Sequence, residues 1–350
     1  MPLPRAIAAP GKHGSDDTAP AGHGASLSIG LSAVIVAASV QEPRVLTIRL
    51  PSRGEGDGSV EALPSGPLEA EHRTLEIGLR TWVERQTSQT LGYVEQLYTF
   101  GDRDRVMGED SPGLPALVVA YLALVREARP AGVADAMWQG CYRYFPWEDW
   151  REGKPESLAR IEDRLSGWAQ DAASEPERQL RQERLGLAFG LPAGSWNEEL
   201  VLERYELLYA AGLVAEASRD LGRPARDLGP RADGLGTGAA MALDHRRILA
   251  TALGRLRGKI KYRPVVFELM PPAFTLLQLQ RTVEALAGVR LHKQNFRRLV
   301  EQQGLVEETG EISAATGGRP ARLVRFRREV LLERPTPGLR LRASRRAAAG

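Results

Sequence analysis

The chain has 350 residues, 43% of them hydrophobic, and a formal net charge of +3. This length allows two or three domains with a sizeable core. Cys141 is the only cysteine, which excludes an intrachain disulfide and argues against a cysteine-based zinc site. The longest early apolar stretch, residues 29–40, is too short to span a bilayer, and residues 1–25 lack the apolar region of a secretory signal. We therefore expect a cytoplasmic protein with no membrane partner.

The two parts of the chain carry charges of opposite sign. From Met241 onward there are 22 Lys and Arg against 9 Asp and Glu, a balance of +13. The rest holds 25 of the 47 basic and 35 of the 44 acidic residues, a balance of −10. This asymmetry favours a polyanion, such as nucleic acid, as the partner of the basic part. The alternative is a plain structural module whose charged face is only solvated.

The first part of the chain is typical of an α/β domain. Residues 1–25 are rich in Pro, Gly, Ala and charge without apolar periodicity, which predicts a disordered tail. The domain is predicted over residues 26–221. Strands are expected at residues 26–40, 44–50, 94–100 and 117–125. Between them, Leu75, Leu79, Trp82 and Val83 recur at helical spacing and predict one prominent helix.

An aromatic cluster follows within residues 141–153. Its members are Tyr142, Tyr144, Phe145, Trp147 and Trp150. Such a cluster can stack a nucleotide base, but it is more often core, and the core interpretation is favoured.

The next residues predict helices and a linker. Residues 151–195 are charged with apolar residues at helical spacing, which predicts a helical insertion. Residues 197–212 predict another helix, which packs on the sheet or forms a dimer contact. Residues 222–240 are rich in Gly, Pro, Arg and Asp and are predicted to be a linker.

Residues 241–334 have the element order of a winged helix-turn-helix domain. A long helix is expected over residues 243–258. Thr275 caps a second amphipathic helix that Gly288 ends, and a basic helix follows at residues 292–303. The segments LVEE and ARLVRF then predict a hairpin with a Gly-rich basic tip. Residues 335–350 are predicted to be a basic tail.

In such a domain the basic helix enters the major groove of duplex DNA, which is therefore the expected partner. Half-sites about one helical turn apart demand a two-fold dimer, so we expect a homodimer. Phe296, Leu299 and Val300 mark the inner face of the basic helix. Gln294 and Arg298 near the opposite face are candidates for base edges, with Asn295 and Arg297 next. Lys293, Arg319 and Arg322 are expected to meet phosphate. The candidate DNA-binding residues are Thr275, Lys293, Gln294, Asn295, Arg297, Arg298, Arg319 and Arg322.

The stretch from Leu63 resembles a Nudix box, whose pattern is G-x5-E-x7-R-E-U-x-E-E-x-G-U, with U an aliphatic residue. The residues that fit the pattern are Gly66, Arg80 and Glu84, together with Trp82, an apolar although aromatic residue at a U position. Those that depart from it are His72, Thr81 and Arg85 at glutamate positions and Thr87 at a glycine position. Nudix hydrolases hold Mg²⁺ or Mn²⁺ with clustered carboxylates, and one glutamate beside an arginine cannot hold that metal cluster well.

Further segments resemble the Nudix-related transcriptional regulators of NAD metabolism. They are YTFGDRDR, VVAYLALV, KQNFRRLVEQQGLVEETG and GGRPARLVRF. The alphaproteobacterial NAD regulator group, which joins a degenerate Nudix-like domain to a winged helix, is also similar. The resemblance implies an α+β fold, with a Nudix-like α/β/α sandwich and helical insertion followed by a winged helix-turn-helix domain.

The same resemblance implies a repressor of NAD or pyridine-nucleotide genes that has no catalytic residues, no metal and no cofactor. A nucleotide effector such as ADP-ribose, NAD or ATP is expected. An arginine at position 85 is no metal ligand, but it can contact a phosphate. The candidate ligand-binding residues are Arg80, Glu84, Arg85, Arg103 and Arg105.

Two other functions stay open. One is a Nudix pyrophosphohydrolase that acts on ADP-ribose-like substrates and carries an appended nucleic-acid-binding domain. Thr81 and Arg85 argue against it, because they stand where carboxylates are needed. The other is a non-catalytic RNA-binding protein, against which the helix and wing order favours duplex DNA. A lone histidine, His245, is interpreted as structural.

Overall fold

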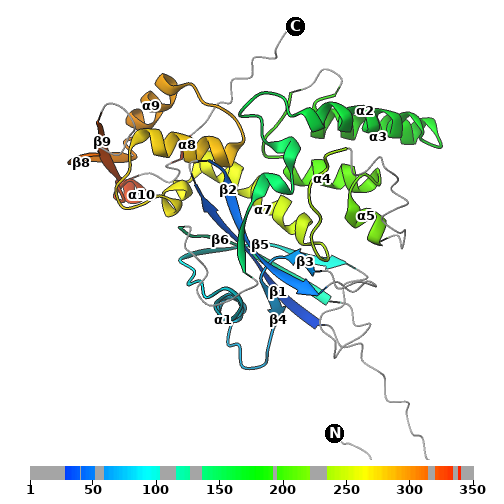
Figure 1. The fold of residues 1–350 in the computed structure, drawn as a ribbon, viewed down its shortest axis with the longest axis horizontal. Coiled ribbons are helices and arrows are strands. Elements are labelled where there is room, and N and C mark those ends of the chain that lie inside the picture. Colours follow the sequence, from blue (N-terminus) through cyan, green and yellow to red (C-terminus); the bar gives the residue numbers. More distant parts are fainter. Residues whose placement is uncertain are drawn as a thin grey trace, which may run out of the picture.

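The computed structural model describes residues 28–39, 41–51, 59–102, 116–126, 136–191, 195–220, 235–313, 320–333 and 338–339 (Figure 1). The predicted disordered tail, residues 1–25, lies outside these ranges. A search of the described helices finds none with the length and apolar character needed to cross a membrane.

The N-terminal half is built on a mixed sheet in the order β3-β2-β1-β6-β5, with β4 paired to β1 and β7 to β2. The strands are β1 (Ser28–Ala38), β2 (Pro43–Pro51), β3 (Ser59–Ala62), β4 (Ser65–Pro67), β5 (Tyr93–Asp102), β6 (Ala116–Leu124) and β7 (Met137–Gly140). β1 and β6 are parallel and central, which suits their nearly continuous apolar sequences. The four predicted strands are confirmed, and three short ones are added to them.

Helices cover both faces of this sheet (Figure 1). Alternate side chains of a strand point to opposite faces. Leu31 and Ile35 therefore pack against α1 (Leu75–Thr87), the predicted helix, through Leu79 and Val83. Val34, on the other face, joins the core that includes α7 (His245–Tyr262). The α/β/α sandwich is confirmed, and α7 forms its third layer.

The middle of the chain is helical, as predicted. Its helices are α2 (Glu156–Gln170), α3 (Glu175–Phe189), α4 (Val201–Ala210) and α5 (Ala215–Asp220). α2 and α3 lie side by side away from the sheet (Figure 1). α4, which was expected on the sheet or at a dimer contact, packs mainly on α7 and α3.

The aromatic cluster lies in and around the short 3₁₀ helices η1 (Cys141–Arg143) and η2 (Pro146–Glu148). Tyr144, Phe145 and Trp147 are fully buried. The core interpretation of this cluster is confirmed.

The C-terminal part forms the predicted winged helix. Its elements are η4 (Val265–Leu269), α8 (Leu276–Ala287), α9 (Lys293–Gln302), β8 (Val306–Ser313), β9 (Ala321–Phe326) and α10 (Val330–Glu333). Gly288 ends α8 in the left-handed conformation at φ 70°. β8 extends well beyond the predicted LVEE, because a bulge between Glu308 and Ile312, with Gly310 at φ 82°, absorbs the break in register.

The two halves share one core. A single hydrophobic cluster runs from Val34 in the sheet through α7 to Phe274 and Phe296 in the winged helix. Met241, at the predicted domain boundary, is fully buried within it. Most of the predicted linker (222–240) lies outside the described residues, namely residues 222–234. The boundaries at 221, 241 and 334 stay predictions, since packing shows no break at Met241.

The predicted basic tail, residues 335–350, contains a residue that packs into the core. Leu339 is fully buried, and its backbone N–H donates to the carbonyl of Ile260 at 3.1 Å. This contact could not be predicted, because one apolar side chain in a Pro- and Gly-rich stretch leaves no periodic signal. Residues 340–350 lie outside the described part of the chain.

Candidate functional site

Helix α9 has one apolar and one polar face. Phe296 is 2% exposed and Val300 is fully buried, while Leu299 is partly buried. This confirms the predicted inner face. The candidate DNA-binding residues of the helix are all exposed, namely Lys293, Gln294, Asn295, Arg297 and Arg298. The structure therefore brings these five together on one solvent-facing surface, here called the α9 face.

The α9 face carries positive charge that the described part of the protein does not neutralise. The ion pairs of the winged helix involve Arg290, Arg322, Arg325 and Arg327. Within the described ranges, the cations of the α9 face form no ion pair within 4 Å. An unneutralised cluster of cations attracts a polyanion and speeds its association.

The wing arginines differ from those of α9, because each has a carboxylate partner. Arg322 pairs with Glu308 at 2.7 Å, and Arg325 pairs with Glu307 at 2.6 Å. Exposed pairs of this kind contribute little stability, so a phosphate can displace the carboxylate. The phosphate contact of Arg322 stays a prediction. Arg319 lies outside the described residues.

Thr275 acts as the cap of α8. Its hydroxyl accepts from the N–H of Gln278 at 3.1 Å, and the Gln278 side chain accepts from the N–H of Thr275 at 2.7 Å. This reciprocal arrangement is a capping box. Thr275 is only 5% exposed, so its predicted DNA contact has little surface to use, and the structure favours the capping role.

The Nudix-like box is arranged around a tryptophan and an arginine. Trp82 covers Gly66 so closely that a Cβ at residue 66 would lie 2.2 Å from the indole ring. The indole N–H of Trp82 donates to the carbonyl of Pro67 at 2.8 Å. The Arg85 guanidinium lies 5.4 Å from the same ring and 3.4 Å from the Glu69 carboxylate. The glycine of the box is thus required by close packing.

Glu69 is the residue at this site that sequence reasoning missed. Its carboxylate lies 3.4 Å from Arg85 and 3.4 Å from Nε2 of His72, both at positions that depart from the Nudix pattern. Nothing in the pattern marks Glu69, because it lies in the variable stretch between Gly66 and His72. Its contacts with His72 and Arg85 form only when the loop folds onto α1, so the sequence alone does not reveal them.

The other ligand-binding candidates occupy different surroundings. Arg80 donates to Glu76 at 2.8 Å and to the carbonyls of Gly92, at 3.1 Å, and Leu91. Glu84 is exposed on the next turn of α1. Arg103 and Arg105 lie outside the described residues. The structure thus places Arg80, Glu84 and Arg85 on one helix but gives Arg80 and Arg85 separate partners.

The described residues do not fit a divalent cation at the box. Among them, no three or more His, Cys, Asp and Glu residues are grouped so as to hold a metal ion. A guanidinium beside Glu69 supplies the positive charge that a metal would bring.

The predicted structural role of His245 is confirmed. It is buried, and its Nδ1 accepts from the backbone N–H of Leu63 at 3.0 Å. This bond ties the start of α7 to the loop that precedes β4.

Residues 266–326 match the model of the family described as the NrtR DNA-binding winged helix domain. These residues form an NrtR-type winged helix. The matched range begins in η4 and leaves out α7, which agrees with the packing of α7 as a layer of the sandwich.

One curated relative matches part of the chain. The chain is 44% identical over 86 residues to the ADPR responsive transcriptional repressor NtrR of Acinetobacter baylyi. The match covers 25% of this chain and 34% of the relative, so it spans about a third of the length of that protein.

Two solved structures match over most of the length of the chain. The crystal structure of Shewanella oneidensis NrtR complexed with a 27mer DNA is 19% identical, with a TM-score of 0.50 over 86% of this chain and 94% of that chain. A MutT/nudix family protein from Enterococcus faecalis is 15% identical, with a TM-score of 0.47 over 86% and 87%. The chain has the fold of the first, a Nudix-like sandwich followed by an NrtR-type winged helix.

Proposed function

We propose that this chain is a DNA-binding transcriptional repressor whose Nudix-like domain senses a nucleotide. The carrying observation is that an NrtR-type winged helix presents the α9 face, an exposed surface with three cations that have no carboxylate partner among the described residues. The expected target genes are those of NAD or pyridine-nucleotide metabolism, as the family resemblance implies. The cytoplasm is the expected location.

In the proposed complex, α9 lies in the major groove. Gln294 and Arg298 read base edges, with Asn295 and Arg297 beside them, since side chains with two donors or a donor and an acceptor can distinguish base pairs there. Lys293, Arg319 and Arg322 meet phosphate, which fixes register without carrying sequence information. A homodimer places two such helices on two half-sites.

The effector is proposed to be ADP-ribose or a related nucleotide. The Acinetobacter relative is described as ADPR responsive, which supports this choice. Arg85 lies on the exposed side of α1, paired only loosely to Glu69 at 3.4 Å, so a pyrophosphate group can compete with that carboxylate. Arg80, Glu84, Arg103 and Arg105 are proposed to line the same site. A ligand that prefers one arrangement of the protein then changes its affinity for DNA.

Duplexes selected by the full chain from a randomised pool test the DNA assignment. We expect gel shifts with a selected duplex at lower protein concentration than with RNA of the same sequence. Binding should weaken steeply with salt, because cations release condensed counterions. ADP-ribose, NAD and ATP are then added in turn, and one of them should change the shift. Equal binding of duplex DNA and RNA would favour the RNA-binding alternative instead.

The chain is also expected not to hydrolyse nucleoside diphosphate compounds at an enzymatic rate. Glu84 is the only glutamate left of the carboxylates that the helix of a Nudix site supplies, and Arg85 carries the opposite charge beside it. ADP-ribose, ATP and dinucleotides should therefore stay intact with Mg²⁺ or Mn²⁺ when the products are followed by chromatography. Metal-dependent turnover that disappears in Glu84→Gln would establish the pyrophosphohydrolase in place of the repressor.

A further inference from the structure

Residues 141–152, here called the strap, contact the end of α8 just before the turn that leads to α9. The Tyr142 hydroxyl donates to the carbonyl of Ala285 at 2.5 Å. The backbone N–H of Trp150 donates to the carbonyl of Gly288 at 2.7 Å. At Gly288 a Cβ would lie 2.3 Å from the carbonyl oxygen of Glu148, so only glycine permits this approach. The strap and the helix-turn-helix are therefore in direct backbone contact.

A buried carboxylate within the strap, that of Glu148, holds the strap in place. Glu148 is 1% exposed and accepts hydrogen bonds from two arginines. Arg204 of α4 donates to it at 2.5 and 2.9 Å, and Arg257 of α7 donates at 2.6 Å. Arg257 also donates through Nε to the carbonyl of Leu286 at 3.1 Å. One guanidinium thus joins the strap to the last turn of α8.

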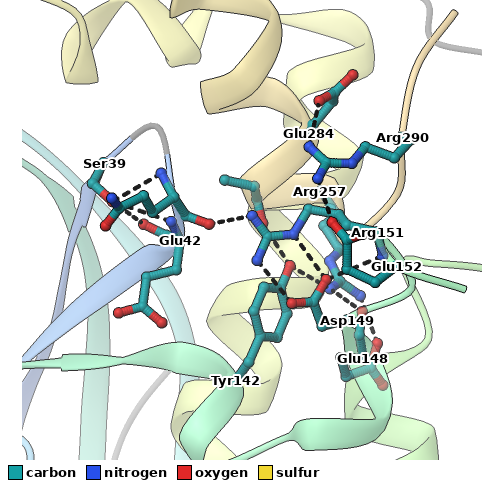
Figure 2. A network of polar contacts seen from close by, with 12 residues as sticks. Ser39, Glu42, Tyr142, Glu148, Asp149, Arg151, Glu152, Arg257, Glu284 and Arg290 are labelled. Carbon is teal, nitrogen blue, oxygen red and sulfur yellow. Dashed lines mark hydrogen bonds and ion pairs between the residues drawn. The ribbon is translucent and has the colours of Figure 1, made fainter. Parts of the chain in front are cut away.

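The same strap reaches the sheet. Arg151 pairs with Asp149 at 2.7 Å (Figure 2). It also donates to the carbonyl of Gln41, in the turn between β1 and β2. At the outer edge, Glu152 pairs with Arg290, which also lies 3.3 Å from Glu284 (Figure 2). Glu284 accepts from the N–H of Leu291 at 2.9 Å, just before α9. The strap therefore spans the distance from the sheet to the start of α9.

We propose that the strap and Arg257 act as positioning residues for DNA binding, because they set the orientation of α9 relative to the Nudix-like sandwich. This inference rests on the proposed function, since it gives a role in DNA reading to residues away from the α9 face. Base edges are read by hydrogen bonds that demand accurate geometry, whereas phosphate contacts tolerate small displacements. Loosening the strap should therefore reduce sequence discrimination more than overall attraction to DNA.

The test compares two tyrosine-to-phenylalanine variants of the full chain. Tyr142→Phe removes the hydrogen bond to Ala285 at the end of α8. Tyr209→Phe is the matched control, because it removes a similar bond, to Asp220 at 2.8 Å, on α4 and outside the strap. The readout is the ratio of affinities for a duplex selected by the wild-type chain and for a scrambled duplex of equal length. We expect the ratio to fall about three- to tenfold in Tyr142→Phe, the effect of one lost hydrogen bond, and to stay unchanged in Tyr209→Phe.

A second pair of variants keeps the inference testable if Tyr142→Phe fails to fold. Glu152 has an 85% exposed side chain, so Glu152→Gln releases Arg290 without disturbing the core. Exposed Glu156, at the start of α2, gives the control Glu156→Gln. The ratio should fall in the first variant and not in the second.

The outcomes separate the two claims. A wild-type chain that binds no duplex overturns the proposed function and this inference with it. A wild-type chain that binds, with an unchanged ratio in Tyr142→Phe and Glu152→Gln, overturns only the inference. Equal falls in the variants and their controls would do the same, because they would show a general loss of structure.

Discussion

Glu148→Ala should lower the free energy of unfolding by about 3–5 kcal/mol, because it leaves buried charges without their counterion. The side chains of Arg204 and Arg257 are 0% and 1% exposed, so water cannot replace the lost carboxylate. Urea unfolding of the full chain measures the change. Glu308→Ala is the matched control, since it breaks an ion pair with Arg322 that is largely exposed and worth about 0–1 kcal/mol. Similar losses in the two variants would contradict the importance of burial.

The loss from Glu148→Ala should also depend on pH. Burial raises the pKa of the Glu148 carboxyl, but the neighbouring Arg204 and Arg257 charges and hydrogen bonds outweigh burial and hold the pKa below its ordinary value of 4.5. A carboxyl whose pKa is lower in the folded state stabilises that state fully above its unfolded pKa. The stabilisation is lost as pH falls through the folded pKa. The difference between wild type and Glu148→Ala should therefore shrink below about pH 4.5.

Arg297→Ala combined with Arg298→Ala should weaken binding to a selected duplex by at least about 30-fold, since each residue is expected to contribute about 1–3 kcal/mol. Both side chains are exposed on the α9 face, so the change leaves the core of the winged helix intact. Titration by fluorescence anisotropy at several salt concentrations measures the loss. The salt slope should also become flatter to the extent that the two residues meet phosphate.

The control for this double variant keeps the same change in net charge. Arg164→Ala combined with Arg184→Ala removes two exposed arginines from α2 and α3, far along the chain from the winged helix. Duplex affinity should then change little. An equal loss in both double variants would show that net charge, and not the α9 face, determines binding.

Local signals in the sequence account for much of this fold. The hydroxyl at Thr275 and the glycine at Gly288 mark both ends of α8, and the structure confirms both. The apolar runs of β1 and β6 are long enough to identify each of them as a buried strand before its neighbouring strands are known. β3, β4 and β7 escaped prediction because three or four residues are too few to show a period.

Contacts distant in sequence account for what the sequence did not reveal. Glu148 lies 56 residues from Arg204 and 109 from Arg257, so its role depends on the tertiary fold. The pairing of Arg85 with Glu69 depends likewise on how the loop folds onto α1. Helix α7 was predicted, but its spacing could not show that it would be buried against a sheet and a helix at once.

The packing of α7 against both the sheet and the winged helix determines where winged-helix modules can be exchanged between relatives. In a chimaera joined at residue 241, α7 would be replaced together with the winged helix. The sheet face around Val34 would then lose the helix that packs on it. A joint between Tyr262 and Val266 would leave α7 with its sheet and transfer the NrtR-type winged helix alone. Such a chimaera would also need a residue equivalent to Leu339. This residue follows the wing in the sequence, its side chain is buried in the core, and its backbone N–H donates to Ile260 near the end of α7.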